Sequence, residues 1–142
     1  MANTNDSYAK GREARRIKRK HVLVVNSDLP ILDLVRELLT EEHYNVTTTN
    51  YVAETFEIIV ALTPELLIVD LVYGEVAGWD LLERLTQHSA TRGIPIVLTS
   101  TNKHLLALAA ADPARFGTNA DLIIPFDTDV LVRLVSTLIG HA

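Results

Sequence analysis

The chain has 142 residues, 48% of them apolar, and a formal net charge of −5 at pH 7. This length suits one domain with its own hydrophobic core and is short for two domains. The chain contains no cysteine, which excludes disulfides and thiolate zinc sites, and no apolar run reaches the roughly 18 residues of a membrane span, so we expect a cytoplasmic protein with no membrane partner.

The N-terminal residues carry most of the positive charge. Residues 1–21 hold seven Lys or Arg against two acidic residues, a charge of +5, whereas the remainder holds six against sixteen, a charge of −10. Because this first stretch has few apolar residues to bury, we expect residues 1–20 to form a basic, disordered arm and residues 21–142 to form the folded domain. A basic arm can also bind nucleic acid, so a nucleic-acid adaptor is kept as an alternative function, although a solvated arm is favoured.

Five segments rich in apolar and β-branched residues alternate with five segments of helical periodicity. This alternation implies right-handed crossovers and a parallel sheet that is covered on both faces, which is a doubly wound α/β fold. The predicted strands are 21–25, 45–49, 66–70, 94–99 and 122–124, and the predicted helices are 29–43, 52–62, 78–87, 103–111 and 129–139.

The first predicted helix has a clear start. Asp28 or Ser27 can cap its N-terminus, and Pro30 is tolerated in its first turn. Its buried face is predicted from four apolar residues at helical spacing, which are Ile31, Leu34, Val35 and Leu38.

One acid, Asp70, ends an otherwise apolar strand. Burying an unpaired carboxylate is costly, so an acid in this position usually lies in a cleft where something binds. In doubly wound sheets that cleft lies beyond the carboxyl ends of the strands. The other residues expected at these strand ends are Asn26, Ser27, Asp28, Ser100, Thr101, Ile124 and Pro125.

Residues 20–140 resemble the receiver domain of bacterial response regulators. Gly78 follows Asp70 by eight residues, and Ser100 follows Pro95 by five, as in that family. The sequence IPF, with Pro125 after Ile124, stands where the family has Lys-Pro-Phe with a cis bond before the proline. The resemblance implies a flavodoxin-like five-stranded sheet of order 2-1-3-4-5. It also implies that Asp70 is the candidate phosphoacceptor and that Ser100 contacts the phosphoryl oxygens.

Several family positions are altered in this chain. The acidic pair that holds Mg²⁺ in the family is replaced by Asn26 and Ser27, and the lysine is replaced by Ile124. The aromatic switch position is occupied by Asp121. The chain is also about two residues longer between Ser100 and Gly117, with Pro113 in the added turn.

These changes affect the expected chemistry. Phosphoryl transfer to a carboxylate needs charge neutralisation, and a neutral amide and a hydroxyl are poor Mg²⁺ ligands. We therefore expect weak or absent Mg²⁺ binding, no metal ligands and slow phosphotransfer at Asp70. Asn26 and Ser27 could instead donate hydrogen bonds to Asp70 and hold the pocket in one state. Asp28 lies one residue past the acidic pair and could swing toward a metal, but a helix-cap role is favoured.

The leading interpretation is a stand-alone, atypical receiver that is not an enzyme. It would act through protein–protein contacts with a sensor kinase or another signalling protein. The last predicted helix has more apolar residues than one buried stripe needs, so we predict a homodimer through the fourth helix, fifth strand and fifth helix, with a complete monomer as the alternative. The competing function is a working phosphoacceptor that uses Asp70 and Ser100 with unusual metal support.

Overall fold

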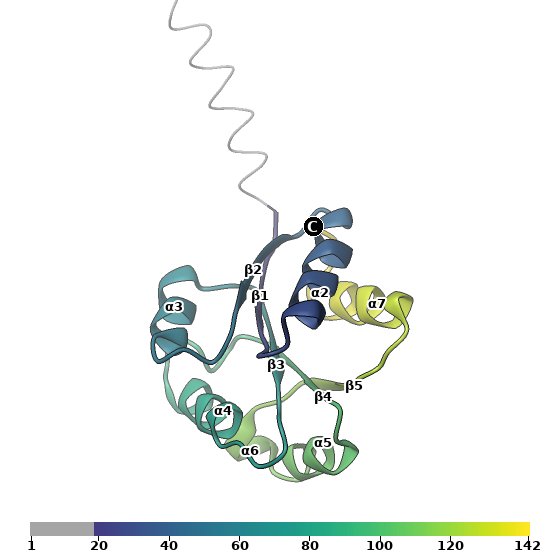
Figure 1. The fold of residues 1–142 in the computed structure, drawn as a ribbon. Coiled ribbons are helices and arrows are strands. Elements are labelled where there is room, and N and C mark those ends of the chain that lie inside the picture. Colours follow the sequence, from purple (N-terminus) through teal and green to yellow (C-terminus); the bar gives the residue numbers. More distant parts are fainter. Residues whose placement is uncertain (1–18) are drawn as a thin grey trace, which may run out of the picture.

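The structure is a computed structural model that describes residues 19–142. A parallel sheet of order β2-β1-β3-β4-β5 runs through its middle, with helices on both faces (Figure 1). This confirms the predicted doubly wound fold and its strand order. Most of residues 1–20, the predicted basic arm, lie outside the described residues. The strands are β1 (His21–Val25), β2 (Asn45–Thr49), β3 (Leu66–Asp70), β4 (Ile96–Ser100) and β5 (Ala120–Ile123).

All five predicted helices are present within the described residues. The structure adds α6, a single turn that begins with Pro113. Gly117 caps its C-terminus with a left-handed φ of 63°. No helix in this part of the chain is long and apolar enough to cross a membrane. The helices are α2 (Leu29–Glu41), α3 (Thr55–Leu62), α4 (Ala77–Gln87), α5 (Lys103–Ala110), α6 (Pro113–Phe116) and α7 (Thr128–Ile139).

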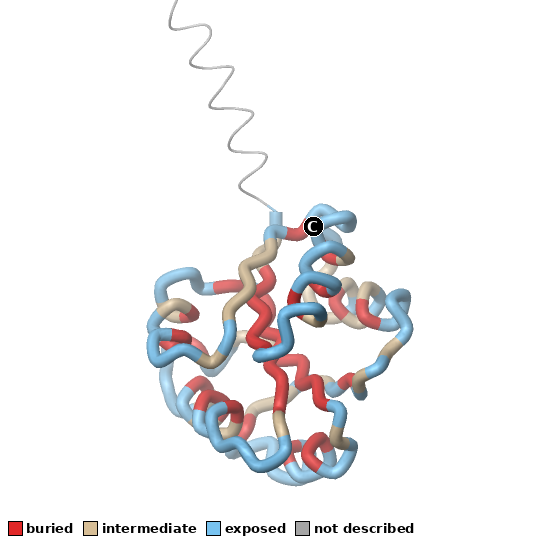
Figure 2. Tube along the Cα trace, viewed as in Figure 1, coloured by how far each residue is buried: buried red, intermediate tan, exposed pale blue. Residues whose placement is uncertain are grey.

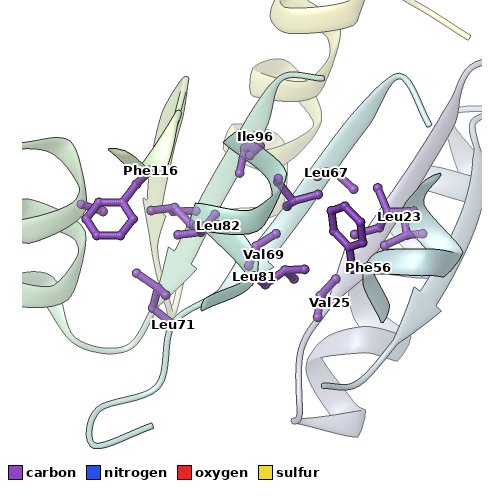
Figure 3. Packing of buried hydrophobic residues seen from close by; sticks show 14 of the residues in the cluster. Leu23, Val25, Phe56, Leu67, Val69, Leu71, Leu81, Leu82, Ile96 and Phe116 are labelled. Atoms are coloured by element: carbon purple, nitrogen blue, oxygen red, sulfur yellow. The ribbon is translucent and has the colours of Figure 1, made fainter. Parts of the chain in front are cut away.

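Side chains alternate along the strands and divide the core into two layers. On one face of the sheet, α2 and α7 cover a layer that includes Val24, Ile68 and Val97. On the other face, α3, α4, α5 and α6 cover a layer that includes Val25 and Val69, and Figure 3 shows part of this packing. Figure 2 shows the central strands as buried and the outward sides of the helices as exposed. Helices therefore cover both faces of the sheet, and the carboxyl ends of the strands remain available for a site.

The predicted buried face of α2 is partly wrong. Its buried residues are Leu32, Val35 and Leu39, whereas Leu34 is 39% exposed. Ile31 and Leu38, both predicted, are partly buried and pack beside this stripe. The helix has enough apolar residues to form two stripes at helical spacing, and only the position of the sheet selects one of them.

Candidate functional site

Asp70 lies at the carboxyl end of β3 and is 7% exposed. Its Oδ1 accepts a hydrogen bond of 2.7 Å from the hydroxyl of Thr99, which is itself buried. The two residues are direct neighbours in the β3–β4 ladder. A buried carboxylate with a single hydroxyl donor is therefore the centre of the candidate site.

Strand alternation decides which neighbours share the face of Asp70. Leu66 and Ile68 face α2 and α7, and Asp70 continues this row. Thr99 continues the row of Val97 on β4 in the same way. Ser100, one residue later, belongs to the opposite face, because one step along a strand reverses the side chain.

The hydroxyl of Ser100, the predicted phosphoryl contact, is engaged by the backbone. It is fully buried, donates to the carbonyl oxygen of Leu71 at 2.7 Å, and accepts from the N–H of Asn102 at 3.0 Å. Ser100 therefore ties the segments after β3 and β4 together. No hydrogen bond joins it to Asp70 among the described residues.

The residues after β1 do not supply the donor that the sequence suggested. The Oδ1 of buried Asn26 accepts from the N–H of Asp28 at 2.9 Å, and Ser27 is exposed. The carboxylate of Asp28 caps α2 by accepting from the N–H of Ile31 at 3.3 Å, as predicted. The hydroxyl that donates to Asp70 is instead that of Thr99, which is the partner of Asp70 in the β3–β4 register.

The segment around β5 carries the other altered positions. The Ile124–Pro125 bond is cis, as the resemblance implied. Ile124 is half-buried, and Pro125 is exposed. Asp121 is an exposed residue of β5 and lines a hollow of about 400 Å³ between α5 and β5. An aliphatic and an acidic side chain therefore occupy the lysine and aromatic positions of the family.

The electrostatic surroundings of Asp70 favour its neutral form. Burial raises its pKa from 3.8 to about 6, the Thr99 hydrogen bond opposes this rise, and the charges of Asp28 and Glu75 add to it. Two ion pairs occur in residues 19–142, Arg84–Glu57 and Arg115–Glu83, and neither involves Asp70. Within this part of the chain, no ion pair offsets the charge of the carboxylate.

These residues do not fit a Mg²⁺ site. Mg²⁺ demands a near-ideal octahedron of hard oxygen ligands, largely carboxylates and water. Here one oxygen of Asp70 is engaged by Thr99, and the oxygen of Asn26 accepts from Asp28. No group of three or more His, Cys, Asp or Glu in the described region could hold a metal ion.

Two further residues, Tyr51 and Gly78, lie next to the backbone oxygen of Asp70. The hydroxyl of Tyr51, in the turn before α3, donates to the backbone oxygen of Asp70. Burial and the charges of Asp70 and Glu75 raise the pKa of Tyr51. A Cβ on Gly78 would lie 3.0 Å from that backbone oxygen and 3.1 Å from the Tyr51 hydroxyl. Gly78 is therefore required by close packing at the start of α4.

Sequence reasoning did not identify Thr99 or Tyr51 as site residues. Thr99 lies inside a predicted strand, and only the β3–β4 register places its hydroxyl beside Asp70. The alternation of side chains along β3 and β4, together with this register, puts Thr99 and Asp70 on the same face of the sheet. Nothing in the sequence around Tyr51 indicates its contact with Asp70.

Comparisons with known proteins identify the family of this chain. A family model described as the response regulator receiver domain matches residues 22–136. A protein from Leptolyngbya boryana, described as an uncharacterised 14.6 kDa protein in the sodA1 3′ region, is 31% identical over 115 residues, which cover 80% of this chain and 86% of that protein. The probable transcriptional regulator ycf29 of Pyropia yezoensis is 25% identical over 121 residues, covering 84% of this chain and 53% of its own length. The chain thus spans about half the length of the ycf29 relative.

A solved structure extends the agreement to the fold. A putative response regulator from Chloroflexus aurantiacus superposes with a TM-score of 0.75 and 26% identity. The match covers 87% of this chain and 100% of the other. The order of strands around Asp70 is therefore one that solved proteins share.

Proposed function

This chain belongs to the response regulator receiver domain family, and from that premise we propose that it signals through protein–protein contacts with Asp70 as its phosphoacceptor. Receiver domains of two-component systems are signalling modules, and they interact with kinases and other signalling proteins. The observation that carries the proposal is a buried acid at the carboxyl end of β3. Doubly wound sheets bind their ligands at the carboxyl ends of the strands. Its partner would be a sensor kinase or another signalling protein.

Phosphoryl transfer to Asp70 is proposed to be slow. A carboxylate oxygen would attack the phosphorus of a phosphodonor, and the bond from phosphorus to the leaving group would break, with the electron pair departing on that group. The protein contributes positioning and charge stabilisation to such a step. Here Asp70 has the hydroxyl of Thr99 as its neighbour, and Asn26, Ser27 and Ile124 stand at the acidic-pair and lysine positions of the family. Losing two preorganised electrostatic contacts would cost about 10⁴ or more in rate.

A working phosphoacceptor with unusual metal support is the second candidate. One observation favours it, because Asp28 lies close enough for its charge to raise the pKa of Asp70. This candidate requires Asp28 to leave the α2 cap, where it accepts from the N–H of Ile31, and to turn its carboxylate toward Asp70. The nucleic-acid alternative depends on residues 1–20, most of which lie outside the described part of the chain.

The surface formed by α5, β5 and α7 is proposed as a homodimer interface. β5 and α7 each expose one large apolar side chain, Ile123 at 38% and Val130 at 39%. The hollow between α5 and β5 adds a concave feature of about 400 Å³. Exposed apolar side chains of this kind are found at protein–protein contact sites.

Intact mass spectrometry tests the proposed function. The protein is incubated with a small acyl phosphate and millimolar Mg²⁺, beside the Asp70→Asn variant. We expect a slow, partial gain of one phosphoryl group in the parent and none in the variant. Rapid, complete phosphorylation that depends on Asp70 would instead support the working phosphoacceptor. A gain that persists in Asp70→Asn would contradict both candidates.

A further inference from the structure

We infer that Thr99 is the positioning residue of the candidate site: its hydroxyl holds one carboxylate oxygen of Asp70 and leaves the other free to attack a phosphodonor. The attacking role rests on the proposed function, whereas the hold on the carboxylate does not. The hydroxyl lies 2.7 Å from Oδ1, and Thr99 and Asp70 are 4% and 7% exposed. A hydrogen bond to an ionised acceptor is stronger than one between neutral groups.

The surrounding backbone makes this contact a rigid one. Thr99 and Asp70 are paired in the β3–β4 ladder, and the N–H of Leu71 bonds to the carbonyl oxygen of Thr99 at 2.8 Å. Threonine is also stiff about χ1, because it carries two heavy atoms on Cβ. The hydroxyl therefore has little freedom to leave the carboxylate.

Ser100 cannot take over this role without giving up its own contacts. Its hydroxyl already donates to Leu71 and accepts from Asn102. Strand alternation also places it on the face of the sheet opposite to Asp70. The two adjacent hydroxyls thus have separate tasks, and the one that reaches Asp70 belongs to Thr99.

Among residues 19–142, the charged groups that act on Asp70 from other elements are not positive. Asp28, before α2, and Glu75, before α4, are both acidic, and both act on the carboxyl group of Asp70. The segment after β5 contributes the aliphatic Ile124 at the lysine position of the family. A neutral hydroxyl is therefore the group that orients the carboxylate.

The expected step is the transfer of a phosphoryl group from an acyl phosphate to Asp70. The free oxygen, Oδ2, forms a bond to the phosphorus of an acyl phosphate. The bond from that phosphorus to the acyl oxygen breaks, and its electron pair leaves on the released carboxylate. With Oδ1 held by Thr99, the attacking lone pair on Oδ2 has a defined direction.

Three variants isolate the hydroxyl. Thr99→Val keeps the shape and removes the donor, Thr99→Ser keeps the donor, and Ser100→Ala removes the neighbouring hydroxyl as the matched control. The ¹³C shift of the Asp70 carboxyl carbon is followed against pH by NMR, with melting curves to verify folding. We expect the pKa of Asp70 to rise by about one unit in Thr99→Val and to stay within about 0.3 unit of the parent in the other two. An unchanged pKa in Thr99→Val, or an equal rise in Ser100→Ala, overturns the inference.

The rate of phosphoryl gain is the second measurement, made at a pH at which Asp70 is ionised in every variant. Positioning predicts a fall of about tenfold or more in Thr99→Val and a rate within about threefold of the parent in Thr99→Ser. Equal rates in the parent and Thr99→Val would remove the positioning role. If the parent shows no phosphoryl gain at all, the proposed function fails, and the NMR titration still decides whether Thr99 holds the carboxylate.

Discussion

Asp70 is 7% exposed, and the charged groups that act on it, Asp28 and Glu75, are both acidic. Its ionised form is therefore less stable in the folded chain than in water, apart from the hydrogen bond from Thr99. This imbalance links protonation of one residue to the stability of the whole chain.

The first prediction concerns pH. Because the pKa of Asp70 rises from 3.8 to about 6 on folding, the native state binds more protons between these values. The stability that Asp70 gains from its raised pKa is fully present below about pH 4. It is lost as pH rises through 6, and the free energy of unfolding then falls by an amount of the order of 3 kcal/mol. Asp70→Asn removes this loss, so the variant should exceed the parent in unfolding free energy at pH 7.5 and match it more closely at pH 4.

Urea unfolding of both proteins across this pH range measures the difference. Comparing the two proteins cancels the titration of all other groups. A difference that stays constant from pH 4 to 7.5 would show that Asp70 keeps an ordinary pKa in the folded state.

The second prediction concerns Gly78. A Cβ at this position would meet the backbone oxygen of Asp70, the Tyr51 hydroxyl and Leu71 at 2.9–3.1 Å. Gly78→Ala should therefore lower the unfolding free energy by about 1–3 kcal/mol through overpacking. Gly93→Ala is the matched control, since nothing lies within 4 Å of its Cβ position, and its effect should stay within about 0.5 kcal/mol. Equal effects in urea unfolding would contradict the packing argument.

At the level of elements, α6 was missing from the sequence prediction. The fourth predicted helix, 103–111, does end before Pro113, but Pro113 also starts a new helical turn. Phe116 of this turn lies edge-on to Trp79 of α4, with 4.8 Å between ring centroids. The added turn therefore extends the core over α4, which no local pattern of residues indicated.

The third prediction tests this packing. Phe116 is 7% exposed, so Phe116→Ala should cost about 3–5 kcal/mol and shift the fluorescence of Trp79 to longer wavelength. Arg115→Ala, next to it, removes an exposed ion pair with Glu83 and should cost about 1 kcal/mol or less. If the two variants are equally stable in urea, α6 does not contribute to the core.

The boundaries of the predicted helices show a related effect. The helical pattern predicts a start at residue 52 for the second predicted helix, whereas the corresponding helix, α3, begins at Thr55. The preceding turn is held by the Tyr51 contact with Asp70 and by the N–H of Val52 bonding to Asn50. A tertiary contact thus delays the helix by about one turn.

For the whole molecule, the distribution of exposed apolar side chains gives the fourth prediction. Val130 lies on α7, within the surface proposed for dimerisation, and Leu62 is exposed to 40% on α3, across the sheet. Light scattering should show a dimer for the parent and for Leu62→Asp, and a monomer for Val130→Asp. Monomeric mass for the parent over the whole concentration range would eliminate the proposed interface.

The fifth prediction concerns Mg²⁺. A ligand that binds only the folded state raises the melting temperature by mass action. The donor set around Asp70 does not fit Mg²⁺, so millimolar Mg²⁺ should leave the melting temperature unchanged, as it should for Asp70→Asn. A rise that depends on both Asp70 and Asp28 would show that Asp28 does turn toward a metal.

Several features of this protein follow from its sequence alone. Apolar runs in alternation with helical patterns specify a doubly wound sheet, because parallel strands buried on both faces need such runs and their crossovers need helices. The position of Asp70 at the end of β3 follows from the same pattern. The spacing of Gly78 and Pro125 from their strands is likewise local.

The tertiary structure decided the contacts between strands and between layers. A period of two fixes the alternation within β3 and within β4, but only their register brings Thr99, rather than Ser100, to Asp70. Packing on the sheet likewise selected Leu32 and Leu39 over Leu34 as the buried stripe of α2. Local patterns repeat along one segment, whereas register and stripe choice depend on the energy of contacts between segments distant in sequence.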